Sequence, residues 1–156
     1  METIEELLNE ALNSERKAKE FYLSAASKAR SSAGKQFFQE LAEFEQNHYD
    51  RVQHVITAKL NNQNITAQHT QANTPAYRSE IKGEIEPNKD EIVSVINLAI
   101  EAEKEAQERY RTIATKLTNE TEKSIFQELA NEERNHQKIL EDQFYHISNT
   151  GTIIWE

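Results

Sequence analysis

Two Glu-x-x-His segments stand 88 positions apart in this chain of 156 residues. Glu45 and His48 form the first segment, and Glu133 and His136 form the second. Because residues three apart lie on the same face of an α-helix, each carboxylate and imidazole can bind one ligand together. Carboxylates and imidazoles are common ligands of divalent transition metals. One such pair is a weak signal in a chain rich in glutamate, so the surroundings of both pairs must decide whether they bind metal.

The two segments belong to an internal repeat. Shifted by 88 positions, residues 7–52 align with residues 95–140 without a gap, and 17 of the 46 paired positions are identical. The identical pairs include Glu15/Glu103, Tyr22/Tyr110, Glu45/Glu133 and His48/His136. Packing alone would repeat apolar residues such as Phe38 and Leu41, but it does not account for repeated carboxylates and imidazoles. The two halves therefore resemble copies of one helical hairpin.

Both halves place their polar residues at one level of a bundle. Every helical residue adds the same rise, so residues that face each other in an antiparallel hairpin lie equally far from its turn. The midpoint between Glu15 and His48 falls near position 31.5, and the midpoint between Glu103 and His136 falls near position 119.5. Both midpoints lie in predicted turns. The single glutamates can therefore meet the Glu-x-x-His pairs at one height.

Six converging side chains of these types suit two metal ions. Four ionised carboxylates in a dry bundle centre would each cost on the order of several kcal/mol without a partner. Two divalent cations would balance the four negative charges, with one imidazole for each ion. Carboxylate-rich ligation suits iron, or manganese as an alternative, better than zinc or copper. We therefore predict two iron ions as the cofactor, with the ligands Glu15, Glu45, His48, Glu103, Glu133 and His136.

The elements that must position these residues are long helices. The chain has three glycines and two prolines, and its apolar residues recur at helical steps of three and four. Helix starts are marked by the capping patterns Thr3 with Glu6, Asn88 with Glu91, and Asn119 with Glu122. We predict an all-α four-helix bundle, built from two repeated helical hairpins joined by a long crossover connection. We predict that the bundle spans residues 1–148 and that a short C-terminal tail spans 149–156. Within the bundle, the predicted segments are hairpin 1–60, crossover 61–88 and hairpin 89–148. The last helix is predicted to end near His146.

The connection and the tail carry weaker signals. Residues 61–88 are rich in amides and hold both prolines, which predicts an irregular segment that returns along the bundle. The tail contains Ile153, Ile154 and Trp155, which we expect to dock on the bundle or on a neighbouring subunit. We expect a homo-oligomer, and the long connection leaves open a dimer in which helices are swapped between subunits.

Composition narrows the partners and the compartment. The net charge of −9 argues against nucleic acid as a partner. No cysteine is present, which excludes disulfides and thiolate metal sites. The first residues, METIEELLNE, lack the basic start and apolar core of a signal peptide, and no apolar run is long enough to span a membrane. We expect a soluble, cytoplasmic protein with no membrane partner.

Other polar residues have less certain roles. Tyr22 and Tyr110 follow the single glutamates by two helical turns, and they are expected either to hydrogen-bond a metal-binding carboxylate or to pack as buried aromatic residues. Glu132 is a candidate for orienting His48 across the bundle, although Phe44 takes its place in the first half. The histidines outside the repeat are expected at surface or packing positions: His54, His69 and His146. Further glutamates are expected on solvated helix faces: Glu20, Glu40, Glu108 and Glu128.

Four segments of the chain resemble the rubrerythrin branch of the ferritin-like di-iron carboxylate superfamily. They are ERKAKEFY (Glu15 to Tyr22), FFQELAEFEQNH (Phe37 to His48), EKEAQERY (Glu103 to Tyr110) and IFQELANEERNH (Ile125 to His136). The resemblance covers all four predicted helices and implies a ferritin-like bundle with a di-iron site at the six residues named above. Members of this family reduce hydrogen peroxide, and more distant relatives oxidise and store iron.

Two departures from the family pattern affect the expected function. Full-length rubrerythrins carry a cysteine-ligated rubredoxin module, and this chain has no cysteine, so the resemblance implies an external electron-donor protein. Many rubrerythrins also have a further glutamate where this chain has Ala106, and Ala18 stands at the matching position of the first half. The remaining set of six ligands is similar to that of bacterioferritin-like sites.

Three functions remain open from the sequence. The leading hypothesis is a di-iron oxidoreductase that reduces hydrogen peroxide with electrons from an external donor. The second is a ferroxidase or iron-storage protein that oxidises Fe(II) with oxygen. The third is a non-catalytic bundle that binds metal for stability or assembly.

Overall fold

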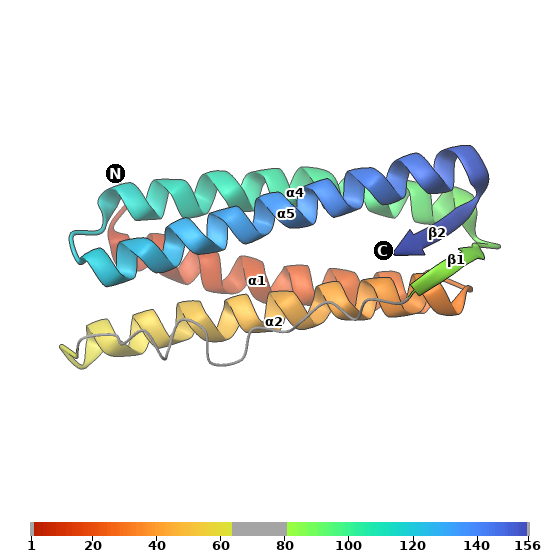
Figure 1. The fold of residues 1–156 in the computed structure, drawn as a ribbon. Helices are drawn as coiled ribbons and strands as arrows, with labels where there is room; N and C mark the ends of the chain where they lie inside the picture. Colours follow the sequence, from red (N-terminus) through yellow and green to blue (C-terminus); the bar gives the residue numbers. More distant parts are fainter. Residues whose placement is uncertain (1, 64–80, 156) are drawn as a thin grey trace.

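Four long helices dominate the computed structural model, which describes residues 2–63 and 81–155 (Figure 1). The helices are α1 (Ile4–Lys28), α2 (Ser32–Leu60), α4 (Lys89–Lys116) and α5 (Glu120–Thr150). Two short strands accompany them, β1 (Ile81–Ile85) and β2 (Thr152–Trp155). The predicted all-α four-helix bundle is confirmed. Among the described helices, none is both long enough and apolar enough to cross a membrane.

The helices pair as two antiparallel hairpins, α1 with α2 and α4 with α5 (Figure 1). Helix α2 ends at one end of the bundle, and α4 begins at the other end, beside the start of α2. The chain must therefore cross the length of the bundle between them, as the predicted crossover requires. Most of that connection, including His69, lies outside the described residues.

Two of the three predicted helix caps are present. Thr3 and Glu6 form a capping box at the start of α1, with the Glu6 amide donating to Thr3 Oγ1 at 3.1 Å. The Asn119 side chain accepts a hydrogen bond from the Glu122 amide at the start of α5. Asn88 stands at the predicted N-cap position of α4 but makes no side-chain cap hydrogen bond; its side-chain amide instead donates to the carbonyl of Lys28 at 2.9 Å. That bond commits the Asn88 side chain to the end of α1.

A two-stranded antiparallel ribbon, which the sequence patterns did not predict, closes one end of the bundle (Figure 1). The fourth helix runs to Thr150, beyond its predicted end near His146, and Gly151 follows in the left-handed conformation with φ 73°. This turn reverses the chain, so that β2 pairs with β1. The expected docking of the tail holds for Ile153, which is fully buried, whereas the side chains of Ile154 and Trp155 lie outside the described part of the structure.

The carboxylate of Glu86 links several segments at this end of the bundle. Glu86, which follows β1, accepts hydrogen bonds from the backbone amides of Arg30, Ser31 and Asn88 and from the Ser31 hydroxyl, at 2.7–3.1 Å. Burial opposes ionisation of Glu86, but these hydrogen bonds outweigh it and hold its pKa below the ordinary value. The turn between α1 and α2 is thereby tied to the start of α4.

The apolar core is divided into two clusters. One cluster lies toward the ribbon and includes Tyr22, Phe38 and Ile96. The other lies toward the opposite end and includes Leu8 and Tyr110. On every helix, the predicted metal ligands fall between the residues of the two clusters. The polar layer is therefore held from both sides by closely packed side chains.

Candidate metal centre

All six predicted metal ligands lie together in the middle of the bundle. Glu15 comes from α1, Glu45 and His48 from α2, Glu103 from α4, and Glu133 and His136 from α5. None of the six is more than 3% exposed. Each helix contributes because its residue at this level points inward.

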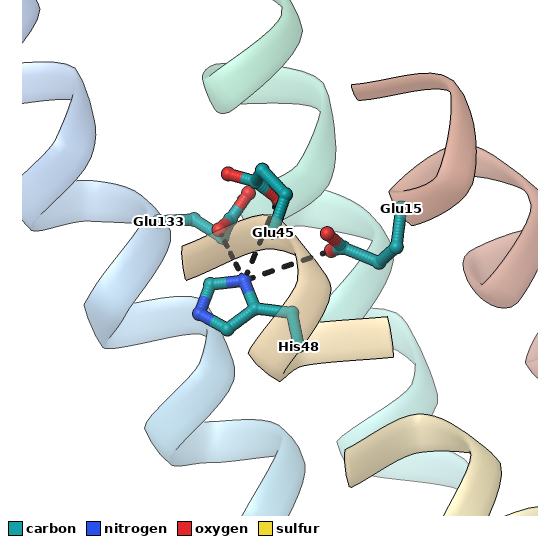
Figure 2. A group of neighbouring side chains, drawn as sticks. All are labelled: Glu15, Glu45, His48 and Glu133. Atoms are coloured by element: carbon teal, nitrogen blue, oxygen red, sulfur yellow. Dashed lines mark ion pairs between the residues drawn. The ribbon is translucent and has the colours of Figure 1, made fainter. Parts of the chain in front are cut away.

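The first of two ligand groups consists of Glu15, Glu45, His48 and Glu133, each offering one atom within 4.8 Å of the others. Figure 2 shows the three carboxylates turned toward one nitrogen of the His48 ring. This nitrogen, Nδ1, lies 2.7 Å from Glu133 Oε1, 3.6 Å from Glu45 Oε2 and 3.8 Å from Glu15 Oε1. The four side chains thus enclose one position suited to a cation.

The second group consists of Glu45, Glu103, Glu133 and His136. His136 Nδ1 lies 3.4 Å from Glu45 Oε1, 3.5 Å from Glu133 Oε1 and 3.8 Å from Glu103 Oε2. The two imidazole rings are stacked, with centroids 5.5 Å apart. Glu45 and Glu133 belong to both groups, so the two cation positions share two carboxylates.

Several buried oxygens of this centre lack a hydrogen-bond donor among the described residues. They are Glu15 Oε2, both carboxylate oxygens of Glu45, and Glu103 Oε2. Buried polar atoms normally have a partner, because an unmet one costs about 1–3 kcal/mol, and more if charged. Metal ions at the two positions would satisfy these atoms and balance the carboxylate charges. The residues therefore fit two divalent cations.

The protonation of the centre reflects its crowding. Burial and the negative charges of Glu45 and Glu133 raise the pKa of Glu15 and of Glu103 well above the ordinary value. Burial acts against His136, yet its carboxylate neighbours raise its pKa to about 8. The raised pKa values favour bound protons at these groups, and a metal ion must displace such protons in order to bind.

The two predicted tyrosines hydrogen-bond carboxylates of the centre. The Tyr22 hydroxyl donates to Glu103 Oε1 at 2.6 Å, and the Tyr110 hydroxyl donates to Glu15. Each bond joins one hairpin to the other. Burial, followed by the charge of the bonded glutamate, raises the pKa of each tyrosine, so both hydroxyls remain donors.

Glu132 reaches the other ring nitrogen of His48, with its Oε1 3.3 Å from Nε2. Arg51, which the sequence patterns did not single out, donates to both oxygens of Glu132 at 3.0 and 2.7 Å. Burial opposes ionisation of Glu132, but its contacts with His48 and Arg51 lower its pKa. Arg51 follows His48 by about one helical turn. This spacing would have suggested that Arg51 lies close to the centre along the bundle, but not that it contacts Glu132 on α5.

Two glutamates differ from the prediction of solvated helix faces. Glu40 is 1% exposed because α2 has a second buried stripe, formed by Ala33, Phe37, Glu40, Phe44, Asn47 and Arg51. Glu128 is partly exposed and forms an ion pair with Arg51 at 3.2 Å. Glu20 and Glu108 are exposed as predicted, and so is His54, while His146 is partly buried.

A pocket of about 290 Å³ between α1 and α4 reaches the centre. Its lining includes the ligand residues Glu15 and Glu103, together with Ala18 and Ala106. These alanines are too short to fill the space beside the carboxylates. Small molecules can therefore approach the centre from this side.

The fold and the centre define a class of protein: a ferritin-like four-helix bundle with carboxylate and histidine groups that can hold metal ions. The rubrerythrin family model matches residues 6–143, so the chain belongs to the rubrerythrin family. A solved structure of a hypothetical protein from Pyrococcus furiosus is similar, with 26% identity, a TM-score of 0.74, and coverage of 94% of this chain and 91% of that one. None of the curated proteins shows a significant match.

Proposed function

We propose that this protein is a di-iron oxidoreductase that reduces hydrogen peroxide, with electrons from an external donor protein. The observation that carries the proposal is the sharing of Glu45 and Glu133 between two buried groups of four ligands. Shared carboxylates would hold two ions side by side. Two Fe(II) ions would together supply the two electrons that, with two protons, convert one hydrogen peroxide to two waters.

The side chains around the centre support this role in three ways. The apolar clusters shield the centre from water on two sides, along the length of the bundle. Tyr22 and Tyr110 hold the carboxylates of Glu103 and Glu15 in place through their hydroxyls. The pocket between α1 and α4 gives a small oxidant access to the carboxylate centre. The chain has no cysteine to bind a second redox centre, so we assign re-reduction to a separate donor protein.

Ferroxidase activity is the second candidate. Ala18 and Ala106 line the pocket beside the centre. Many rubrerythrins have a further glutamate at the position of Ala106, whereas this chain has only the six ligands, and a set of six favours the ferroxidase. In that case oxygen would be the oxidant and Fe(II) the substrate. A third possibility, a bundle that binds metal without redox turnover, predicts metal loading with no rapid oxidation by either oxidant.

Rapid mixing separates these functions. The protein is loaded anaerobically with two Fe(II) per chain and mixed with stoichiometric hydrogen peroxide or with oxygen, and iron oxidation is followed by absorbance. We expect much faster oxidation by peroxide, ending after two irons per chain. Faster reaction with oxygen that continues as iron is added would favour the ferroxidase. Glu45→Gln tests the centre, and the exposed Glu108→Gln on α4 serves as its control.

A further inference from the structure

The His48 imidazole contacts the carboxylate of Glu132 on the side away from the centre, and Arg51 in turn contacts that carboxylate. His48 turns Nδ1 toward Glu15, Glu45 and Glu133, and turns Nε2 toward Glu132 Oε1 at 3.3 Å. A neutral imidazole has one donor and one acceptor nitrogen. If Nδ1 binds a cation, the proton must be on Nε2, which then donates to Glu132. The carboxylate therefore selects the tautomer that a metal ion needs.

Glu132 is itself fixed in place. Arg51 Nη1 donates to both of its oxygens, at 2.7 and 3.0 Å. Arg51 is only 3% exposed and is oriented in turn by Asn47 at 3.1 Å and Glu128 at 3.2 Å. Because these contacts come from two helices, rotation of the Glu132 carboxylate would break several of them at once. The His48 ring consequently has a rigid support.

The repeat does not reproduce this support. The position equivalent to Glu132 in the first half is Phe44, and the position equivalent to Arg51 in the second half is Ile139. Phe44 lies edge-on to the His136 ring, with centroids 5.1 Å apart. A hydrocarbon ring cannot accept a proton from an imidazole as a carboxylate does. The six ligands are duplicated, whereas the pair formed by Glu132 and Arg51 is not.

We propose that Glu132, held by Arg51, is a positioning residue for His48 that strengthens metal binding at one of the two cation positions, the one that also includes Glu15. The inference rests on the proposed metal centre. A carboxylate that accepts the imidazole proton increases the basicity of the metal-binding nitrogen and fixes the ring, and such a partner contributes 10- to 100-fold to metal affinity. Glu132 contacts His48, and His48 belongs to only one of the two ligand groups, so the effect of Glu132 belongs to one position.

Cobalt(II) titration of the metal-free protein tests the proposal, since cobalt absorbs light when bound and does not require an oxidant. We expect wild type to bind two cobalt ions per chain. Glu132→Gln should weaken one binding step by about 10- to 100-fold and leave the other within about threefold. Glu108→Gln is the control, because Glu108 is exposed on α4 and pairs with Arg111 rather than with Arg51 or His48, and it should leave both steps unchanged.

Two further measurements separate positioning from general loss of structure. Arg51→Lys keeps the charge but has one nitrogen where Arg51 uses Nη1 for Glu132 and Nη2 for Glu128, so it should weaken the same step by less than Glu132→Gln does. In the cobalt-loaded protein, the Nε2 proton of His48 should exchange with water more slowly in wild type than in Glu132→Ala, as measured by NMR. Equal weakening of both steps, or no weakening, would overturn the role of Glu132. Failure of wild type to bind two ions would instead overturn the metal centre itself.

Discussion

The two hairpins contribute the same kinds of polar residue to the centre, yet they differ in what lies behind them. Each hairpin supplies a single glutamate, a Glu-x-x-His pair and a tyrosine. Behind these, the α2 side provides Arg51 and the α5 side provides Glu132, whereas the equivalent positions hold Ile139 and Phe44. The ligand residues must meet one shared geometry, so duplication retained them. The residues behind them are free to make the two positions unequal.

The largest expected effect comes from the carboxylates that both positions share. Glu45→Ala and Glu133→Ala should each weaken binding of both metal ions, by more than about 100-fold, because each residue belongs to both ligand groups. Metal content per chain after gel filtration, measured by mass spectrometry, checks this. The exposed Glu20→Ala on α1 is the control and should retain two ions. A Glu45→Ala variant that retains both ions would refute the shared-ligand arrangement.

A smaller loss is expected from the carboxylates that serve one position each. Glu15→Ala and Glu103→Ala should each lose one ion of two, because each residue occurs in only one ligand group. The same metal analysis applies, with Glu108→Ala as the exposed control on α4. Retention of two ions by Glu15→Ala, as in the control, would show that the first position lies elsewhere. Loss of both ions would show that the positions are strongly coupled.

Much of the centre could be predicted because helix geometry converts sequence spacing into height. Glu15 and His48 lie equally far from their turn, and they do meet, with Oε1 and Nδ1 3.8 Å apart. The same rule applies within a hairpin but not between hairpins, since their relative register depends on the packing of the whole bundle. The contact between Arg51 and Glu132, which joins α2 to α5, therefore could not be predicted from spacing.

The sequence patterns also could not predict the two-stranded ribbon or the second buried stripe of α2. Strands β1 and β2 are short and lie far apart in the chain, so neither shows an alternation long enough to be recognised. Glu40 repeats as Glu128, and both looked like surface residues. Only the structure shows that α2 is covered on a further face, where Glu40 is buried.

The turns of the two hairpins offer a comparison of stability. Glu86 binds the first turn with three hydrogen bonds and the start of α4 with a fourth, whereas the second turn relies on the Asn119 cap. Glu86→Gln should lower the free energy of unfolding at pH 7 by about 2 kcal/mol, because hydrogen bonds to a charged acceptor are the stronger ones. Asn119→Ala should cost about 1 kcal/mol. Urea unfolding of the metal-free variants measures both values.

The pH dependence of the Glu86 variant has a definite sign. Because the folded protein lowers the pKa of Glu86, the carboxylate stabilises the fold above the ordinary pKa of glutamate, and this stabilisation is lost as the pH falls through the lowered pKa. The difference between wild type and Glu86→Gln should therefore be largest near pH 7 and shrink under acidic conditions. Glu84→Gln is the control on β1, since Glu84 is partly exposed and makes one hydrogen bond to a described residue, from the Ser32 amide. A difference that grows on acidification would contradict this account.

The smallest effect is expected from the tyrosine hydroxyls. Tyr22→Phe and Tyr110→Phe each remove one hydrogen bond to a buried carboxylate, at Glu103 or at Glu15, and keep the aromatic packing. Each change should lower the free energy of unfolding of the metal-free protein by about 1 kcal/mol. The two effects should be similar, because both bonds link α1 to α4. Urea unfolding measures them, with the exposed Tyr145→Phe as the control.

The two tyrosine variants also test whether the inequality between the hairpins extends beyond His48. Glu132 and Arg51 do not contact either tyrosine, so they give no reason for Tyr22→Phe and Tyr110→Phe to differ. Equal losses would confine the asymmetry of the centre to the imidazole side. A clearly larger loss for Tyr110→Phe, whose partner Glu15 shares its ligand group with His48, would mean that the support behind His48 acts on the whole group. If neither variant differs from Tyr145→Phe, both tyrosines serve only as buried aromatic packing.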